Sequence, residues 1–431
     1  MVSPFDLSQP HAVVSPAAPV ATRAAVPGSK SLTNRYLLLA AAAAGTSFLK
    51  NPLHSDDTTY MRAALKAMGV TIDEQPEGWS VHGRSPWQNP TEPLFIGNAG
   101  TAMRFLTPAL PAQGVAATIT GNERMLVRPI KDLVDGLRQL KTEVAYRGEE
   151  GFPPLQLQPP LTGGACRIRG DASSQYLSGL LMALPTAQQD SLIEIEGPLV
   201  SRTYVAMTLD CMARLGVTVG VNEDHTRFEI AGGQTYRATD IDIEPDASTA
   251  SYWFALPLMV GGTLTVPACP EQSHQGDFGL VGLLAEMGAR VTRDGGELTI
   301  SDAPLNGVDV DMNTMSDVAP TLAVVATRAQ SPTTIRNIYN MRIKECDRIE
   351  ALQTAFDQLG LKMENGRDWI KIYPGRVTTP ALVNPEDDHR MAMVFALLGL
   401  ADGGVGIRDP ECVAKTYPTF YEAFGAVLHR K

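Results

Sequence analysis

The stretch IEALQTAFDQLG at residues 349–360 decides the fold of this chain. Its apolar side chains recur every three or four positions, the spacing that places them on one face of an amphipathic helix. They are Ile349, Leu352, Phe356 and Leu359. Gly360 follows directly, and glycine readily takes the left-handed conformation in which many helices end. The stretch therefore predicts a helix with one buried face and a defined end.

Similar stretches recur along the chain, which indicates internal repeats. Apolar stripes at residues 130–140 and 205–215 share the spacing, looser copies lie at 61–68 and 280–287, and a shorter copy lies at 421–428. The five clear copies end at Gly69, Lys141, Gly216, Gly288 and Gly360, about 72 to 75 residues apart. Short strands are expected next, at residues 70–72, 144–146, 217–219 and 291–292. Six units of strands plus helices predict an α/β protein.

The length of the chain predicts two domains. A chain of 431 residues is too long for one ordinary core. Six units give three per domain, and the Glu-Pro-Asp turn at residues 244–246 is a natural boundary. We therefore expect one domain at residues 28–243 and a second made of residues 1–27 plus 244–431. For residues 1–21 we expect only a flexible or edge-strand role.

Composition excludes several classes of protein. With 44% hydrophobic and 19% charged residues the chain is globular, and no run of about 20 uncharged apolar residues could span a membrane. Residues 1–25 lack the features of a signal or transit peptide. The five cysteines form no CxxC pair and the seven histidines no HxxxH or HExxH pattern, so we expect a reducing cytoplasm and no metal. A net charge of −11 without a basic block argues against nucleic acid.

Cations in turns point to an anion site instead. Lys344, Glu345 and Arg348 lie within five residues of one another, so an acid stands between two cations. Further cations stand in Gly-, Pro- or His-marked turns, namely Arg104, Arg128, Arg390 and Lys415. Fixed cations around an embedded acid fit a site that binds two phosphorylated anions and moves a proton.

Several small-residue turns open helices and could bind anions through backbone amides or hydroxyls. They are VPGSKSLTNR at 26–35, GNAGTAMR at 97–104, DASSQ at 171–175 and the turn at Ser201. The first is no Walker A loop, because Ser29 rather than glycine precedes Lys30. Capped helix starts or tight packing are the alternative explanations, although a plain cap explains the Ser173-Ser174-Gln175 triplet less well. Asp317 is likewise open to two interpretations, a helix cap or a general base.

Taken together, the motifs resemble the 5-enolpyruvylshikimate-3-phosphate (EPSP) synthase family. The matching stretches run in order from about residue 26 to residue 420. They are PGSKSLTNR, SDDTTYM, GNAGTAMR, RPI, GDASSQYLSGLLMALP, VSRTY, DASTASY, QGD, NIYNMRIKECDRI, DHRMAM and AKTYP. The resemblance implies the two-domain enolpyruvyl transferase fold, an inside-out α/β barrel of six βαβαββ repeats, three per domain, that closes on a hinge.

The resemblance also implies a reaction and its residues. Phosphoenolpyruvate would join the 5-hydroxyl of shikimate 3-phosphate and release phosphate, in the pathway to chorismate and the aromatic amino acids, without cofactor or metal. Asp317 would accept the hydroxyl proton, Glu345 would protonate the methylene carbon, and Lys30 would contact both substrates. The residues implied for shikimate 3-phosphate are Lys30, Ser31, Arg35, Ser173, Ser174, Gln175, Ser201, Asp317, Asn340 and Lys344. Those implied for phosphoenolpyruvate are Lys30, Gly100, Arg128, Gln175, Arg348, Arg390 and Lys415.

Two stretches depart from the family pattern. Phe105 stands where the family usually has proline after GNAGTAMR, and Leu126-Val127 replaces a common Lys-Glu pair before Arg128. The family inhibitor glyphosate is expected to bind the phosphoenolpyruvate pocket, so we expect Phe105 to alter sensitivity to it. The family also implies a monomer.

Two other functions remain as alternatives. The sister enolpyruvyl transferase acting on UDP-N-acetylglucosamine shares the fold, but it typically carries a loop cysteine near an Arg-rich turn. None of the five cysteines here has that setting. A non-catalytic anion-binding relative would be favoured by loss of Lys30, Asp317 or Glu345, and all three residues are present.

Overall fold

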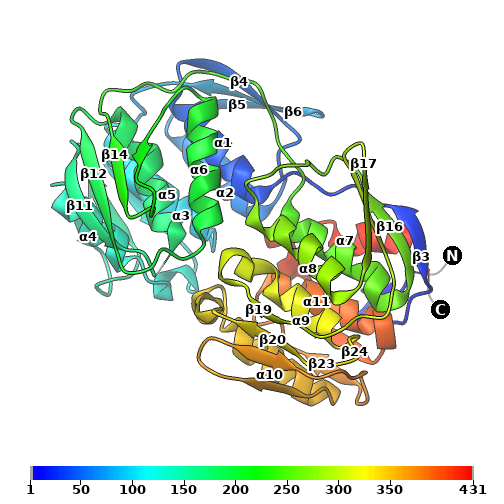
Figure 1. Cartoon of the computed structure of the whole chain (residues 1–431). Coiled ribbons are helices and arrows are strands. Elements are labelled where there is room, and N and C mark those ends of the chain that lie inside the picture. Colours follow the sequence, from blue (N-terminus) through cyan, green and yellow to red (C-terminus); the bar gives the residue numbers. More distant parts are fainter. Residues whose placement is uncertain (1–2, 172, 430–431) are drawn as a thin grey trace. The chain divides into compact units, whose positions relative to one another are not determined.

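The computed structural model describes residues 3–171 and 173–429. Ala172 of the expected DASSQ turn and the outermost residues of the chain lie outside the described residues. The chain divides into two compact units, Gly28–Glu244 and a split unit of Met1–Pro27 with Pro245–Lys431. Within the described residues, each unit contains six α-helices and three four-stranded sheets (Figure 1).

The Gly28–Glu244 unit repeats one motif three times. Its helices are α1 (Lys30–Ala42), α2 (Asp56–Ala67), α3 (Gly100–Ala112), α4 (Lys131–Gln139), α5 (Ser174–Ala183) and α6 (Arg202–Arg214). Its strands are β4 (Gly45–Lys50), β5 (Thr71–Gln75), β6 (Gly78–Gly83), β7 (Leu94–Phe95), β8 (Ala117–Thr120), β9 (Glu143–Tyr146), β10 (Leu155–Gln158), β11 (Gly164–Arg169), β12 (Ser191–Glu196), β13 (Gly220–Val221), β14 (Arg227–Ile230) and β15 (Ile241–Asp242). The sheet orders are β15-β4-β6-β5, β7-β8-β10-β9 and β11-β12-β14-β13. Each sheet thus joins an antiparallel hairpin to a parallel pair of strands.

The split unit is built in the same way. Its helices are α7 (Ala247–Val260), α8 (Gly279–Met287), α9 (Ala319–Ala326), α10 (Arg348–Leu359), α11 (His389–Asp402) and α12 (Phe420–Val427). Its strands are β1 (Phe5–Asp6), β2 (His11–Val14), β3 (Val20–Arg23), β16 (Gly262–Val266), β17 (Arg290–Asp294), β18 (Glu297–Ser301), β19 (Asp309–Asp311), β20 (Thr333–Arg336), β21 (Met363–Asn365), β22 (Ile370–Ile372), β23 (Ala381–Val383) and β24 (Val405–Arg408). The orders are β17-β18-β16-β3, β19-β20-β22-β21 and β1-β2-β24-β23. The predicted α/β class with six repeats is confirmed, and no sheet of the described residues closes into a barrel.

The N-terminal segment completes the sixth repeat. After α12 the described chain holds no hairpin of its own, and β1 with β2 takes that place, antiparallel to β24. The strand β3 adds to a different sheet, in parallel with β16. Residues 5–23 are therefore structural strands: β1 and β3 lie at sheet edges, as expected, while β2 lies inside its sheet.

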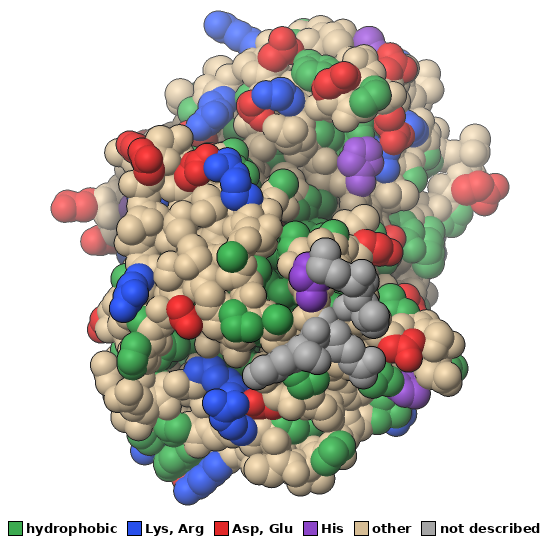
Figure 2. Space-filling model, turned by 90° about the vertical axis from the view of Figure 1, so that its right-hand side faces the viewer, with side chains coloured by type: hydrophobic (Ala, Val, Ile, Leu, Met, Phe, Trp, Pro, Cys, Tyr) green, Lys and Arg blue, Asp and Glu red, His purple; other side chains and the backbone are tan. Residues whose placement is uncertain are grey.

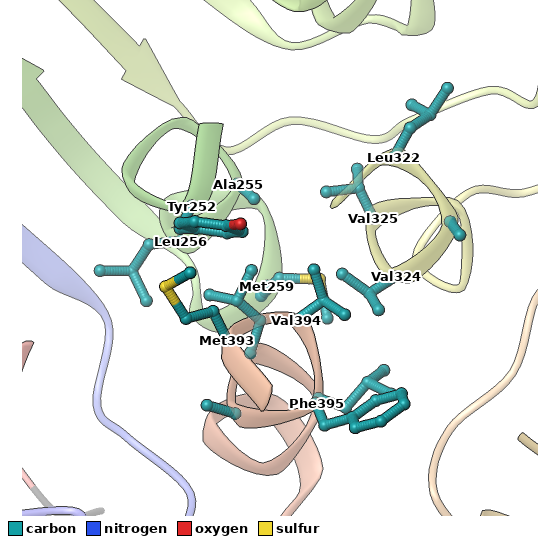
Figure 3. Packing of buried hydrophobic residues seen from close by; sticks show 14 of the residues in the cluster. Tyr252, Ala255, Leu256, Met259, Leu322, Val324, Val325, Met393, Val394 and Phe395 are labelled. Atoms are coloured by element: carbon teal, nitrogen blue, oxygen red, sulfur yellow. The ribbon is translucent and has the colours of Figure 1, made fainter. Parts of the chain in front are cut away.

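Each repeat uses two kinds of helix. The predicted amphipathic helices correspond to α2, α4, α6, α8, α10 and α12, and the residues that end five of them have positive φ: Gly69, Lys141, Gly216, Gly288 and Gly360. The other six helices are buried on nearly every face, so no apolar stripe marks them in the sequence. In the split unit, side chains of α7, α9 and α11 point toward one another in one core (Figure 3).

One predicted strand is wrong. Residues 217–219 are irregular, and β13 begins at Gly220 instead. The side-chain amide of Gln234 accepts from the Thr218 backbone N–H (3.2 Å) and donates to its carbonyl (3.2 Å). Because a side chain takes the hydrogen bonds that a neighbouring strand would make, strand pairing starts two residues later.

A proline and a glycine bring α3 and α5 close together. Pro108 lies inside α3 and has no N–H to donate to the carbonyl of Arg104. Gly179 of α5 faces that carbonyl, and a Cβ there would lie only 2.5 Å from its oxygen. The glycine therefore permits a close helix approach, which also brings the starts of α3 and α5 near each other.

Charges are mixed on the surface. On the face shown in Figure 2, Lys and Arg side chains are interspersed with Asp and Glu. No helix among the described residues is long and apolar enough to cross a membrane.

Candidate functional site

In the Gly28–Glu244 unit, α1 presents Lys30 from its first turn. Ser29 caps the helix, because its hydroxyl accepts from the Leu32 amide (3.4 Å). The Lys30 ammonium lies 3.2 Å from the carboxylate of Asp57 at the start of α2. The two side chains are 14% and 3% exposed, respectively. Lys30 is thus held at a partly open position by a carboxylate that is itself buried.

Arg35 lies deeper, among three helices. Its Nε donates to Thr208 Oγ1 (2.8 Å) and its Nη1 to the Ser31 carbonyl (3.0 Å). The guanidinium lies 5.0 Å from the centre of the Phe105 ring, and both residues are almost fully buried. Burial lowers the pKa of Arg35. Phe105, which departs from the family pattern, therefore packs directly on an expected substrate residue.

The turn before α3 gathers two arginines around Gly100. A Cβ at Gly100 would lie 2.3 Å from Nη1 of Arg104 and 2.7 Å from Nη2 of Arg128. Arg128 follows the 3₁₀ turn η1 (Met125–Val127), is 6% exposed and donates to the side-chain oxygen of Asn98 (3.0 Å). Because Gly100 has no side chain, the two guanidinium groups can approach the first turn of α3, a place suited to an anion. In contrast to Arg128, Val127 of the departing Leu-Val pair points outward and is 57% exposed.

The expected hydroxyl donors stand at the starts of α5 and α6. Ser173 is the N-cap of α5, and its hydroxyl accepts from the Gln175 amide (3.3 Å). The Gln175 side chain donates to Thr101 Oγ1 (3.3 Å), which joins this turn to the Gly100 turn. Ser201 precedes α6 with φ 52°, and its hydroxyl does not cap the helix. A left-handed non-glycine residue carries a backbone cost, so the position of Ser201 is imposed by its surroundings.

In the split unit, Arg348 at the start of α10 joins three carboxylates. It is 1% exposed. Its Nε donates to Asp388 (2.7 Å), its Nη2 to Glu345 (2.8 Å) and its Nη1 to Asp317 (3.1 Å). Although burial alone would lower it, the pKa of Arg348 is raised by these carboxylates. One guanidinium group therefore holds both of the expected acid–base residues.

Asp317 lies in the 3₁₀ turn η4 (Asn313–Val318), just before α9. Val318, not Asp317, is the N-cap of α9, so the cap interpretation is wrong. The Asp317 carboxylate contacts Arg390 (2.9 Å), Arg348 (3.1 Å) and Lys344 (3.5 Å). Burial would raise its pKa, but these three cations outweigh burial and hold the pKa of Asp317 well below its usual range.

The remaining expected residues of this unit flank Asp317 and Asp388. Asn340, in the 3₁₀ turn η5 (Tyr339–Ile343), donates to Ser316 Oγ (2.8 Å) beside Asp317. Lys415, at the end of η6 (Pro410–Lys415), is 8% exposed. Burial raises the pKa of Asp387, and the charge of Lys415 opposes this rise. The structure thus brings the expected residues of the split unit around Asp317 and Asp388, apart from Lys415, which is linked to the neighbouring Asp387.

Two carboxylates were not singled out from the sequence. Asp57 anchors Lys30, and Asp388 both anchors Arg348 and caps α11 by accepting from the Arg390 amide (2.9 Å). Both lie inside quoted motifs, SDDTTYM and DHRMAM. An aspartate at the start of a helix, in the first turn of the amphipathic α2 or at the N-cap of the buried α11, is the signal that could have identified them, since a buried carboxylate needs a partner.

Comparisons with known proteins identify the family of this chain. A family model described as EPSP synthase (3-phosphoshikimate 1-carboxyvinyltransferase) matches residues 14–424. A 3-phosphoshikimate 1-carboxyvinyltransferase of Sulfurovum sp. (strain NBC37-1) is 44% identical over 408 residues, 93% of this chain and 95% of the relative. One of Yersinia pestis bv. Antiqua (strain Angola) is 44% identical over 405 residues, covering 93% and 94%.

Solved structures show the same fold. EPSP synthase from Acinetobacter baumannii superposes with a TM-score of 0.81 at 25% identity, covering 96% of this chain and 97% of that one. The enolpyruvyl transferase NikO from Streptomyces tendae, at 16% identity and TM-score 0.77, shares the fold over 97% and 98% of the two chains. This chain therefore belongs to the EPSP synthase family, and its reaction transfers the enolpyruvyl group of phosphoenolpyruvate to shikimate 3-phosphate.

Proposed function

We propose that the two units contribute different parts of the machinery for this transfer. In the Gly28–Glu244 unit, shikimate 3-phosphate is bound by Lys30, Ser31, Arg35, Ser173, Ser174, Gln175 and Ser201. In the split unit it is bound by Asp317, Asn340 and Lys344. Phosphoenolpyruvate is bound by Lys30, Gly100, Arg128, Gln175, Arg348, Arg390 and Lys415. Asp317 is the base, and Glu345 is the acid.

The observation that carries this proposal is the shared guanidinium of Arg348. It donates to Asp317 (3.1 Å) and to Glu345 (2.8 Å), so base and acid are oriented by one buried group. Such fixed geometry is what general acid–base catalysis requires, because each carboxyl group must reach its own proton.

The reaction needs a base and an acid on different atoms. Glu345 protonates C3 of phosphoenolpyruvate, which makes C2 electrophilic. Asp317 takes the proton of the 5-hydroxyl, whose oxygen forms a bond to C2. The tetrahedral product then loses phosphate as the Glu345 carboxylate takes a proton back from C3, which restores the double bond, and the proton on Asp317 leaves with the phosphate. Fixed cations stabilise the phosphate as it departs.

Substrate anions would also activate the base. The cations that lower the pKa of Asp317 are Arg390, Lys344 and Arg348, the same residues proposed to hold substrate anions. When a phosphate or carboxylate shares these cations, Asp317 loses part of its stabilisation and its pKa rises toward the ordinary range. Asp317 therefore becomes the stronger base only when the substrates are bound.

Three further properties belong to the proposal. Glyphosate competes for the phosphoenolpyruvate residues, and Phe105 alters its affinity through the packing of Arg35 and the first turns of α3. The chain works as a monomer. Its place is the cytoplasm, which is supported by five cysteines that are all free thiols.

Phosphate release tests the proposal. Purified protein is mixed with phosphoenolpyruvate and either shikimate 3-phosphate or UDP-N-acetylglucosamine. Release only with the shikimate ester is expected, with a large loss of kcat in Glu345→Gln. Release only with the sugar nucleotide would move the assignment to the sister transferase. Ligand binding without release from either acceptor would favour a non-catalytic relative.

A further inference from the structure

Two motifs of the split unit have no role in the account above, DASTASY at 246–252 and QGD at 275–277. The structure joins them. The Gln275 side chain accepts from the Ala247 amide (3.1 Å) and donates to the Pro245 carbonyl (2.9 Å), which fixes it to the start of α7. Asp277 follows in the 3₁₀ turn η3 (Gly276–Phe278) and meets Ser248 in the first turn of that helix.

A directed chain of hydrogen bonds runs from Arg390 through Ser248 to Asp277. The hydroxyl of Ser248 has a single hydrogen, which it donates to Oδ2 of Asp277. Its oxygen is then an acceptor, and Nη2 of Arg390 donates to it (3.3 Å). The same nitrogen donates to Oδ2 of Asp317 (2.9 Å). The two hydrogens of Nη2 therefore point to two fixed oxygens, which sets the plane of the guanidinium group.

The burial of the Asp277 carboxylate is energetically unfavourable. The residue is 4% exposed, and within residues 3–171 and 173–429 its Oδ1 has no hydrogen-bond partner. Burial, with a smaller effect of Asp317, raises the pKa of Asp277 to about 6, although Arg390 and the Ser248 hydrogen bond act in the opposite direction. A neutral residue would be the more stable choice in such surroundings, so a buried, half-satisfied carboxylate points to a functional requirement.

We propose that Asp277 and Ser248 are positioning residues for phosphoenolpyruvate: they hold Arg390 in the orientation that binds the substrate anion and keep it from turning fully onto Asp317. The inference rests on the proposed role of Arg390. Without the Ser248 contact, both hydrogens of Nη2 are free to follow Asp317, the carboxylate already 2.9 Å away. The cation would then be less available to substrate.

Steady-state kinetics of Ser248→Ala, Asp277→Asn and the double variant test the proposal. Each single variant is expected to raise KM for phosphoenolpyruvate on the order of tenfold, the effect of weakening one hydrogen bond to a charged group. KM for shikimate 3-phosphate should stay within about twofold, because Arg390 is assigned to the other substrate. KM for phosphoenolpyruvate in the double variant should be no higher than in the more affected single variant, since both changes weaken the same chain of hydrogen bonds.

Ser251→Ala is the matched control. It removes a buried hydroxyl from the same helix, but that hydroxyl contacts the Ser248 carbonyl (2.6 Å) and Thr321 (2.9 Å) rather than Arg390. Its KM values should match those of the wild type. An equal rise of KM in Ser251→Ala, or a rise of both KM values together, would show that the pair is merely structural.

Failure of the inference and failure of the proposed function give different results. If the wild type turns over and both single variants keep its KM for phosphoenolpyruvate, only the positioning role is refuted. If the wild type releases no phosphate with either acceptor, the proposed function fails. Calorimetric titration with phosphoenolpyruvate in the presence of shikimate 3-phosphate still tests the positioning role in that case, because equal affinity in wild type and variants would refute it.

Discussion

Gly100 offers the sharpest test of the anion site, because the structure sets the size of the perturbation. In Gly100→Ala, the new methyl group would lie 2.7 Å from Nη2 of Arg128 and 2.3 Å from Nη1 of Arg104. An ordinary carbon contact needs about 3.5 Å, so the Arg128 guanidinium must retreat by about 0.8 Å. The backbone itself is not strained, since the φ of Gly100 lies outside the left-handed region.

This displacement is large enough to break a contact. A hydrogen bond of about 2.9 Å that lengthens by that amount exceeds the range of N–H···O bonds. The loss of one charge-assisted bond costs about 1.5–3 kcal/mol, which corresponds to about 10- to 150-fold in affinity. We therefore expect KM for phosphoenolpyruvate to rise at least about tenfold in Gly100→Ala, with little change for shikimate 3-phosphate.

The thermal stability of Gly100→Ala distinguishes a local loss of phosphoenolpyruvate binding from misfolding of the variant. Alanine favours a helix over glycine by up to about 1 kcal/mol, so Gly100→Ala should melt no lower than the wild type. Gly282→Ala is the control, because Gly282 lies in α8 and a Cβ there meets no atom within 4 Å. It should gain stability and keep both KM values. An unchanged KM for phosphoenolpyruvate in a folded Gly100→Ala protein would refute the assignment of Gly100 and Arg128 to this substrate.

Three other perturbations test the site. Glu345→Gln should lower kcat by about 10²- to 10⁴-fold with both KM values nearly unchanged, as measured by phosphate release in a stopped assay. A kcat within about threefold of the wild-type value would show that Glu345 is not the general acid. Asp277→Asn should stabilise the protein at pH 7.5 but not near pH 4. The folded pKa of Asp277 is about 6 against 3.8 in the unfolded chain, so the folded state binds more protons between these values and stability falls as pH rises through them. The gain in the free energy of unfolding is at most roughly 3 kcal/mol and is measured by denaturant unfolding at both pH values. Equal gains at the two pH values would contradict the predicted pH dependence of stability. Lys30→Met should raise both KM values and destabilise the fold by up to about 3–5 kcal/mol, because it removes the ammonium group that lies 3.2 Å from the buried carboxylate of Asp57. Normal stability in this variant would mean that the Lys30–Asp57 pair contributes little to the free energy of unfolding.

Amphipathic helices were predictable because their signal is local. In α10 the apolar residues recur at helical spacing and Gly360 adopts φ +72°, so pattern and end agree. Even Lys141, the one non-glycine end, adopts φ 62° at the expected position. The six helices that are buried on nearly every face carry no stripe, and α9 is buried at every residue. Periodicity cannot detect a helix whose whole circumference is apolar.

Strand pairings between distant segments could not be predicted from the sequence. Nothing local in residues 5–14 indicates that they complete a sheet with β24, because that pairing depends on which repeat lacks its own hairpin. The strand expected at 217–219 was wrong for a related reason: Gln234, sixteen residues later, takes the hydrogen bonds of Thr218.

The same distinction between local and long-range features applies to the candidate site. The sequence by itself determined the α/β class, the six repeats, the family and the residue types of an anion site, because each depends on spacing or on motifs written within a few residues. Only the tertiary structure decided that Arg348 joins Asp317, Glu345 and Asp388, and that Asp277 reaches Arg390 through Ser248. Which buried charged groups form ion pairs depends on distances of about 3 Å between residues far apart in the chain. Because a buried charge without its partner is strongly destabilising, each of these pairs is difficult to rearrange. Such distances exist only once the helices have packed.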